Sequence, residues 1–317
     1  MGVNVRGQAT GIRRPGEAGR GRASVLLASG IGRGGGIFAL GEWGTRRLSD
    51  VPTTGMATWG FGSQLASISW TEVDPAPPTS SLARRNGTQP AGAFEVAVRE
   101  PHALLWSRGL LHAVSTSDNS IVSLDAMGRT RDVWKAPGDG DCWHLNSLTV
   151  HGGQLVASAF GRFSHHREWA ENERRHGAGI VFETGTGREI LGGLSCPHDP
   201  TFIDGSWIVC NSAERAVVRF DTGGEEIARV DLDGWTRGVA WDSESLFVGV
   251  SAHRMLGDDG RARVARLDRR SLEKRGEWEL PCPEVFALSW AAPDVVAGYE
   301  MSALAATHSG EPAPLAA

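Results

Sequence analysis

Two segments of the chain, PHALLWSRGLLHAVSTSDNSIVSLD at residues 101–125 and PHDPTFIDGSWIVCNSAERAVVRFD at residues 197–221, align with each other without a gap. Each begins with Pro-His and an apolar stretch, turns at a pair that contains Gly, and returns as a second stretch that ends in Ser or Asn. A third stretch ends in Asp. Apolar residues alternate with small or polar ones in each stretch, which is the period of a β-strand. The two segments are therefore copies of one multi-stranded unit.

The unit recurs more loosely elsewhere in the chain, at residues 143–157, 236–250 and 283–299. The motif that opens the copies falls at His102, His144, His198, Arg237 and Glu284, at intervals of 42, 54, 39 and 47 residues. A four-stranded propeller blade takes about 40–50 residues. A β-sandwich also has short strands at regular spacing, but it does not predict a repeat of this length. We therefore expect an all-β protein, a β-propeller.

The number of blades follows from the two ends of the chain. Residues 55–70 begin a further blade, and we place its third strand at 92–98, after the Pro/Ser/Gly-rich loop 74–92. Residues 24–49 resemble the later strands of a blade that lacks its first, and the chain ends after one or two strands of its last blade. Strands from the N- and C-termini would then share one blade and close the ring. This predicts six blades in one domain at 23–305, between a disordered tail at 1–22 and a flexible tail at 306–317.

The composition limits the class of protein. The chain has 317 residues, of which 40% are hydrophobic and 22% charged, as in globular proteins. The net charge of −5 gives no reason to expect a nucleic-acid partner. No apolar run is long enough for a membrane span, and residues 1–22 lack the apolar core of a secretory signal. The four cysteines form no CxxC pair and are expected to be reduced thiols. We therefore expect a cytoplasmic protein with no membrane partner.

The residues that open the repeats should meet in the centre of the molecule, because equivalent positions of the innermost strands face one channel. This predicted ring consists of Thr54 or Gly55, His102, His144, His198, Arg237 and Glu284. Three imidazoles with an open position are typical of a catalytic metal site, and Zn, Fe, Mn, Ni and Cu all accept them. We predict that His102, His144 and His198 bind a divalent transition metal. The alternative is that these side chains line a polar channel without a metal.

Further polar residues are expected at the same face. We predict three catalytic residues: Glu284 to move a proton or to act as a fourth ligand, Arg237 to anchor an anionic group, and Asp199 beside them. The predicted substrate-binding residues are Asn146, Asn211, His253, Glu300 and Trp169. Trp169 belongs to an insertion at 161–179, between the second and third strands of its blade. This insertion could form a short helix and cover the pocket as a lid.

Several strings resemble one known family. They are CWHLNSLTV, SHHREWAEN, LSCPHDPTFIDGSWIVCNSAERAVVRFD and GWTRGVAWDSESLFVGVS, and the family is the uncharacterised bacterial family DUF4915. The resemblance covers roughly residues 24–300 and is most specific from the CPHDP string to RFD. It implies a propeller, in agreement with the repeat, and it implies no settled reaction.

Three functions are compatible with this sequence. The first is an enzyme that acts on a small anionic molecule with help from the metal, of lyase, cyclase, isomerase or hydrolase type, in specialised metabolism. The second is a metal-free lyase or isomerase that uses His and Glu as acid and base. The third is a non-catalytic propeller that binds a peptide or a glycan. Bound metal separates the first from the second, and tight binding of a small molecule separates both from the third.

Overall fold

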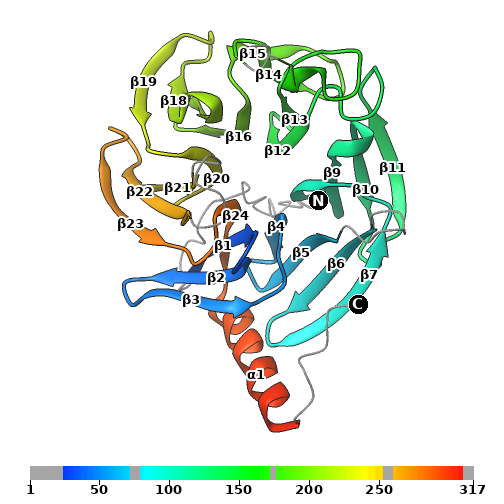
Figure 1. The fold of residues 1–317 in the computed structure, drawn as a ribbon, viewed down its shortest axis with the longest axis vertical. Coiled ribbons are helices and arrows are strands. Elements are labelled where there is room, and N and C mark those ends of the chain that lie inside the picture. Colours follow the sequence, from blue (N-terminus) through cyan, green and yellow to red (C-terminus); the bar gives the residue numbers. More distant parts are fainter. Residues whose placement is uncertain (1–23, 72–78, 172–175, 253–259, 310–317) are drawn as a thin grey trace, which may run out of the picture.

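The computed structural model of the chain describes residues 24–71, 79–171, 176–252 and 260–309. Its strands form six antiparallel sheets of four strands each, arranged as blades around one axis (Figure 1). This confirms the predicted six-bladed β-propeller. Among the helices of the described residues, none is long and apolar enough to cross a membrane.

The first blade joins the two ends of the chain. Its innermost strand is β24 (Glu284–Ala291), which pairs with β1 (Val25–Ile31) and is followed by β2 (Gly36–Gly41) and β3 (Gly44–Ser49). The predicted closure by N- and C-terminal strands is therefore confirmed. The hydrogen bonds between β1 and β24 join the two ends of the chain and so close the ring.

The other five blades each run outward from the axis in chain order. The second has β4 (Gly55–Trp59), β5 (Gln64–Thr71), β6 (Thr79–Asn86) and β7 (Gln89–Val96), and the third has β8 (Pro101–Ser107), β9 (Leu110–Ser115), β10 (Ser120–Leu124) and β11 (Thr130–Lys135). The fourth has β12 (Leu145–His151), β13 (Gln154–Ala159), β14 (Gly179–Glu183) and β15 (Glu189–Leu194). The fifth has β16 (Pro197–Ile203), β17 (Ser206–Asn211), β18 (Ala216–Phe220) and β19 (Glu226–Asp231), and the sixth has β20 (Trp235–Trp241), β21 (Ser245–Ser251), β22 (Arg263–Asp268) and β23 (Lys274–Glu279).

The core lies between the blades. Each of the six apolar clusters contains residues from two neighbouring blades. Phe38 of β2, for example, packs in one cluster with Phe247 of β21. Burying such a side chain stabilises the fold by about 1.5–3 kcal/mol, so the blades hold one another in place around the axis.

A β-bulge interrupts five of the six innermost strands just after the predicted ring position. In β8 the register shifts between Pro101 and Leu104, and in β16 it shifts between His198 and Thr201. Strands β12, β20 and β24 show equivalent shifts. A bulge adds a residue to one strand and redirects its side chains. Neighbouring residues at these points can therefore face different sides of the inner strand.

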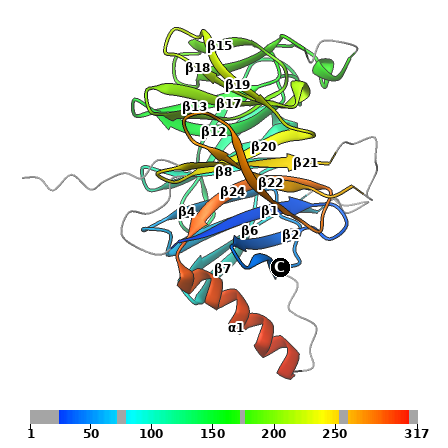
Figure 2. The ribbon, with the colours of Figure 1, turned by 90° about the vertical axis from the view of Figure 1, so that its left-hand side faces the viewer.

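Two of the predicted segments are wrong. Residues 293–299, read as a second C-terminal strand, begin the helix α1 (Pro293–Ser309), because β1 already occupies the place beside β24. The predicted loop 74–92 contains the whole of β6, the turn at Gly87 with a φ of 54°, and the start of β7, so the strand predicted at 92–98 is the fourth of its blade and not the third. Helix α1 packs between the first and second blades through Val295 and Val296 and then projects from the ring (Figures 1 and 2).

The predicted tails lie mostly outside the described residues. Residues 1–22 and 310–317 are not described. Helix α1 reaches Ser309 and so includes the first four residues of the segment predicted as a C-terminal tail.

Candidate functional site

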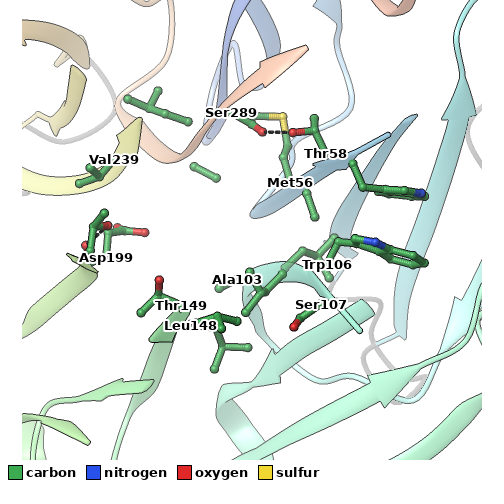
Figure 3. A pocket seen from close by; sticks show the side chains of 18 of the residues that line it. Met56, Thr58, Ala103, Trp106, Ser107, Leu148, Thr149, Asp199, Val239 and Ser289 are labelled. Carbon is green, nitrogen blue, oxygen red and sulfur yellow. Dashed lines mark hydrogen bonds between the residues drawn. The ribbon is translucent and has the colours of Figure 1, made fainter. Parts of the chain in front are cut away.

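A cavity of about 590 Å³ lies on the propeller axis (Figure 3). All six innermost strands contribute to its wall, through Thr58, Trp106, Thr149, Asp199, Val239 and Ser289 among others. At one end it reaches His102 and Phe286, near the starts of their strands. At the other it reaches Phe61 and Arg108, in the turns that follow the inner strands. The fold therefore provides a central site built by the whole ring.

Among the described residues that line the cavity, Asp199 is the one with an acidic side chain. It lies in the bulge of β16 with a φ of 49°, a left-handed conformation that Asp tolerates better than most residues. The backbone N–H of Gly238 donates a 2.6 Å hydrogen bond to its Oδ2. Gly238 has a φ of 75°, and a Cβ there would lie 3.3 Å from the carbonyl oxygen of Phe286. The backbone conformations of Asp199 and Gly238 together hold this carboxyl at the edge of the cavity (Figure 3).

The ionisation of Asp199 is shifted by its surroundings. Burial raises the pKa of its carboxyl from 3.8 to about 6, and the Gly238 hydrogen bond and the Arg237 charge oppose this shift. A carboxyl with a pKa near neutrality can both accept and release a proton under physiological conditions.

The rest of the wall is largely apolar, with a few hydroxyl groups. Leu104, Leu148 and Leu288 come from three different strands. Thr58 and Ser289 share a 3.0 Å hydrogen bond between their hydroxyl oxygens (Figure 3). A small number of polar groups in an apolar wall is typical of small-molecule sites.

The structure brings the three predicted histidines together, but only His102 lines the cavity. The ring centroids of His102 and His144 lie 5.1 Å apart, edge to face. Burial holds the pKa of His198 well below its usual value, and the charge of Arg237 and the two other imidazoles lower it further. His144 and His198 are buried and lie outside the cavity lining.

Hydroxyl groups fix the orientation of two of these rings. His102 Nδ1 lies 3.0 Å from Thr116 Oγ1, and His198 Nδ1 lies 2.8 Å from Ser212 Oγ. Each hydroxyl donates to a backbone carbonyl of the next blade, so it accepts the hydrogen bond from the imidazole. Both rings therefore carry their proton on Nδ1 and are tied to the neighbouring blade.

The arrangement does not fit the predicted metal site. Among the residues that the structure describes, no group of three or more His, Cys, Asp or Glu side chains is placed to hold a metal ion. The three imidazoles are instead hydrogen-bonded to Thr116, Asp141 and Ser212. Elemental analysis is the direct test of the Zn, Fe, Mn, Ni or Cu ion that the sequence predicted.

The predicted insertion covers His144 on its other side. It lies between β13 and β14 as expected, but its described residues contain only the short 3₁₀ helix η2 (Glu168–Ala170), and residues 172–175 are not described. Trp169 packs on His144 with ring centroids 4.1 Å apart and donates a 3.0 Å hydrogen bond to the Asp141 carbonyl. The Asp141 carboxylate lies 3.0 Å from His144 Nδ1, and burial raises its pKa to about 7. Trp169 does not line the cavity.

Arg237 and Glu284 pair with each other. Their side chains are 3.4 Å apart, and the Arg237 guanidinium lies 3.5 Å over the ring of Phe286. Phe286 lines the cavity, whereas Arg237 and Glu284 do not. The structure therefore does not place either charge where it was predicted to contact a substrate.

The remaining predicted substrate-binding residues also lie outside the cavity lining. Asn146 accepts a 2.6 Å hydrogen bond from Ser158, and Asn211 accepts one of 2.6 Å from the Ser195 N–H, so both brace the chain. Glu300 lies on α1, away from the cavity, in a 2.6 Å ion pair with Arg46. His253 lies outside the described residues.

Sequence reasoning missed the polar groups of the cavity wall and the partner of His144. Thr58, Thr149 and Ser289 lie further along the inner strands, where the alternation of side chains could have indicated them. Asp141 precedes its strand in a loop and carries no comparable signal.

Comparison with known proteins supports the fold. The family model of DUF4915, a domain of unknown function, matches residues 90–273. A search of curated proteins finds no match. Similar solved structures include a chain of a nidogen/laminin complex, with 11% identity over 85% of this chain and 98% of that chain and a TM-score of 0.61. A candidate 6-phosphogluconolactonase from Bacteroides fragilis has 12% identity, 84% and 98% coverage and a TM-score of 0.56. A protein of unknown function from Bacteroides caccae has 10% identity, 84% and 98% coverage and a TM-score of 0.58. At these identities the similarity shows the fold alone.

Proposed function

Because the chain belongs to DUF4915, a family of unknown function, we propose its activity from the cavity itself: the protein binds a small organic molecule on the propeller axis and acts on it by acid–base chemistry. Asp199 is the group that carries the proton. The expected reaction is of lyase or isomerase type, in which a proton leaves one atom of the substrate and another is returned.

The observation that supports this proposal is the carboxyl of Asp199 in a cavity of suitable size. Ligand pockets measure about 300–1,000 Å³, and this one measures about 590 Å³. The pKa of about 6 keeps both forms of the carboxyl accessible near neutral pH. His102 lines the same cavity, so a second group that can exchange protons is close to any ligand.

The proposal differs from the sequence expectation in two respects. It uses no metal, because the imidazoles do not form a ligand set in the described residues. It also drops the preference for an anionic substrate, which rested on Arg237. The guanidinium of that residue is paired with Glu284 and lies behind Phe286.

Metabolite profiling tests this function. Purified protein is incubated with a bacterial small-molecule extract, and mass spectrometry follows which compounds change. We expect at least one compound to be converted by the wild type and not by Asp199→Asn.

The matched control is Asp204→Asn. Asp204 lies just after the same strand and has a φ of 51°, but its carboxylate is exposed and pairs with Arg269. This variant should convert the compound like the wild type. Binding without conversion would favour the non-catalytic alternative, and equal conversion by Asp199→Asn would refute the role of Asp199.

A further inference from the structure

The cavity holds a negative charge that the described residues leave uncompensated. Oδ2 of Asp199 accepts the Gly238 hydrogen bond, and within the described residues no donor is within hydrogen-bond distance of Oδ1. None of the ion pairs among these residues includes Asp199. A partly buried carboxylate without an ion-pair partner is costly, so the site is poised to accept a proton or a cationic donor from a ligand.

The nearby basic side chains are engaged elsewhere. Arg237 is paired with Glu284 and stacked on Phe286. It lowers the pKa of Asp199 through its charge and forms no ion pair with it. Arg108, at the opposite end of the cavity, donates a hydrogen bond to the Gly153 carbonyl. The end of the cavity near Asp199 is therefore acidic, and it disfavours an anionic ligand because like charges repel.

The remaining wall of the cavity suits an apolar body. Met56, Leu148, Val239 and Leu288 face the cavity from four different blades. The cavity lining extends from the level of Asp199 to the turns that follow the inner strands, at Phe61 and Arg108. A ligand with one polar end and an apolar or aromatic remainder would place its polar end at the carboxylate.

From these contacts we infer that the axial cavity selects a hydrophobic amine, bound through its ammonium group to Oδ1 of Asp199. This inference rests on the proposed function, because it names the ligand class of the same cavity. The ammonium supplies both the charge and the hydrogen-bond donors that the carboxylate lacks, and charge-assisted hydrogen bonds are the stronger kind.

Calorimetric titration with three probes of one shape tests the inference. The probes are 4-phenylbutylamine, 4-phenylbutanol and 4-phenylbutyrate, measured at pH 8 where Asp199 is ionised. We expect the amine to bind about tenfold or more tightly than the alcohol, and the carboxylate more weakly than the alcohol. In Asp199→Asn the amine should lose this advantage while the alcohol keeps its affinity. Asp204→Asn should retain the wild-type order.

A cavity-filling variant separates this inference from the proposed function. Thr149→Trp places an indole in the cavity and should abolish binding of every probe, provided that its circular dichroism and thermal midpoint show a folded chain. If the alcohol binds and Thr149→Trp removes it, but the amine is not preferred, the amine inference is wrong and the cavity remains a binding site. If no probe binds the wild type, or Thr149→Trp binds them equally well, both the inference and the proposed site are refuted.

Discussion

Replacing Asp199 with Asn should stabilise the fold at neutral pH and have less effect in acid. The amide has nearly the shape of the carboxyl and can still accept the hydrogen bond from Gly238. Asn also tolerates the left-handed backbone that Asp199 adopts. The main change is therefore the removal of a partly buried charge.

The size of this effect follows from the pKa. The folded state raises the pKa of Asp199 from 3.8 to about 6, so it holds the proton more tightly than the unfolded state does. The stabilisation from this group is complete below pH 3.8 and is lost as the pH rises through 6. At about 1.4 kcal/mol per unit, ionisation costs the folded state roughly 3 kcal/mol above pH 7. At pH 4.5 the cost is only about 1 kcal/mol.

Urea unfolding at pH 4.5 and pH 7.5 measures this difference. The gain in unfolding free energy of Asp199→Asn over the wild type should be larger by about 2 kcal/mol at pH 7.5 than at pH 4.5. Asp204→Asn, whose carboxylate is exposed, should show no such dependence. A gain that is equal at both pH values, or a loss at pH 7.5, would contradict the raised pKa of the Asp199 carboxyl.

Three further predictions concern the surroundings of the cavity. Gly238→Ala should lower the unfolding free energy by about 1–3 kcal/mol, because a φ of 75° strains a residue with a side chain and its Cβ would lie only 3.3 Å from the Phe286 carbonyl oxygen. An unchanged urea midpoint would argue against this strain. Trp169→Ala should destabilise the chain by about 1–3 kcal/mol through lost packing on His144, and thermal unfolding measures this loss. Calorimetry should show that the affinity of the probes for the cavity changes by less than about threefold. Loss of probe binding would mean that the insertion shapes the cavity. Elemental analysis of protein purified without a His tag or a chelator should find no stoichiometric transition metal. The opposite result would be one metal ion per chain that is lost in a folded His102/His144/His198→Ala variant. That result would support the metal site predicted from the sequence.

The repeat made most of the ring predictable from the sequence. Equivalent Pro-His motifs located β8 and β16, and the truncated first and last units indicated the shared blade of β1 and β24. The C-terminal segment from Pro293 was harder, because a short apolar run fits a strand and a helix equally well. Strand β6 was missed because it is polar, although Asn86-Gly87 is a typical hairpin turn.

The site was less predictable because side-chain direction depends on the bulges. The repeat correctly indicated that His102, His144 and His198 lie at one level, and their contacts follow from that. It could not show that the left-handed backbone at Asp199 turns this residue into the cavity while His198 beside it is buried. The stacking of Arg237 on Phe286 is a contact between two blades, and the sequence pattern of neither repeat predicts it.

The most direct test of the account is a crystal structure of the wild type after incubation with the bacterial small-molecule extract. We predict ligand density in the axial cavity, between the inner strands, with a polar atom within hydrogen-bond distance of Asp199 Oδ1. The same experiment on Thr149→Trp should show a cavity filled by the indole. Density bound at the histidines on the side of Trp169, or on an outer face with no ligand on the axis, would contradict the account.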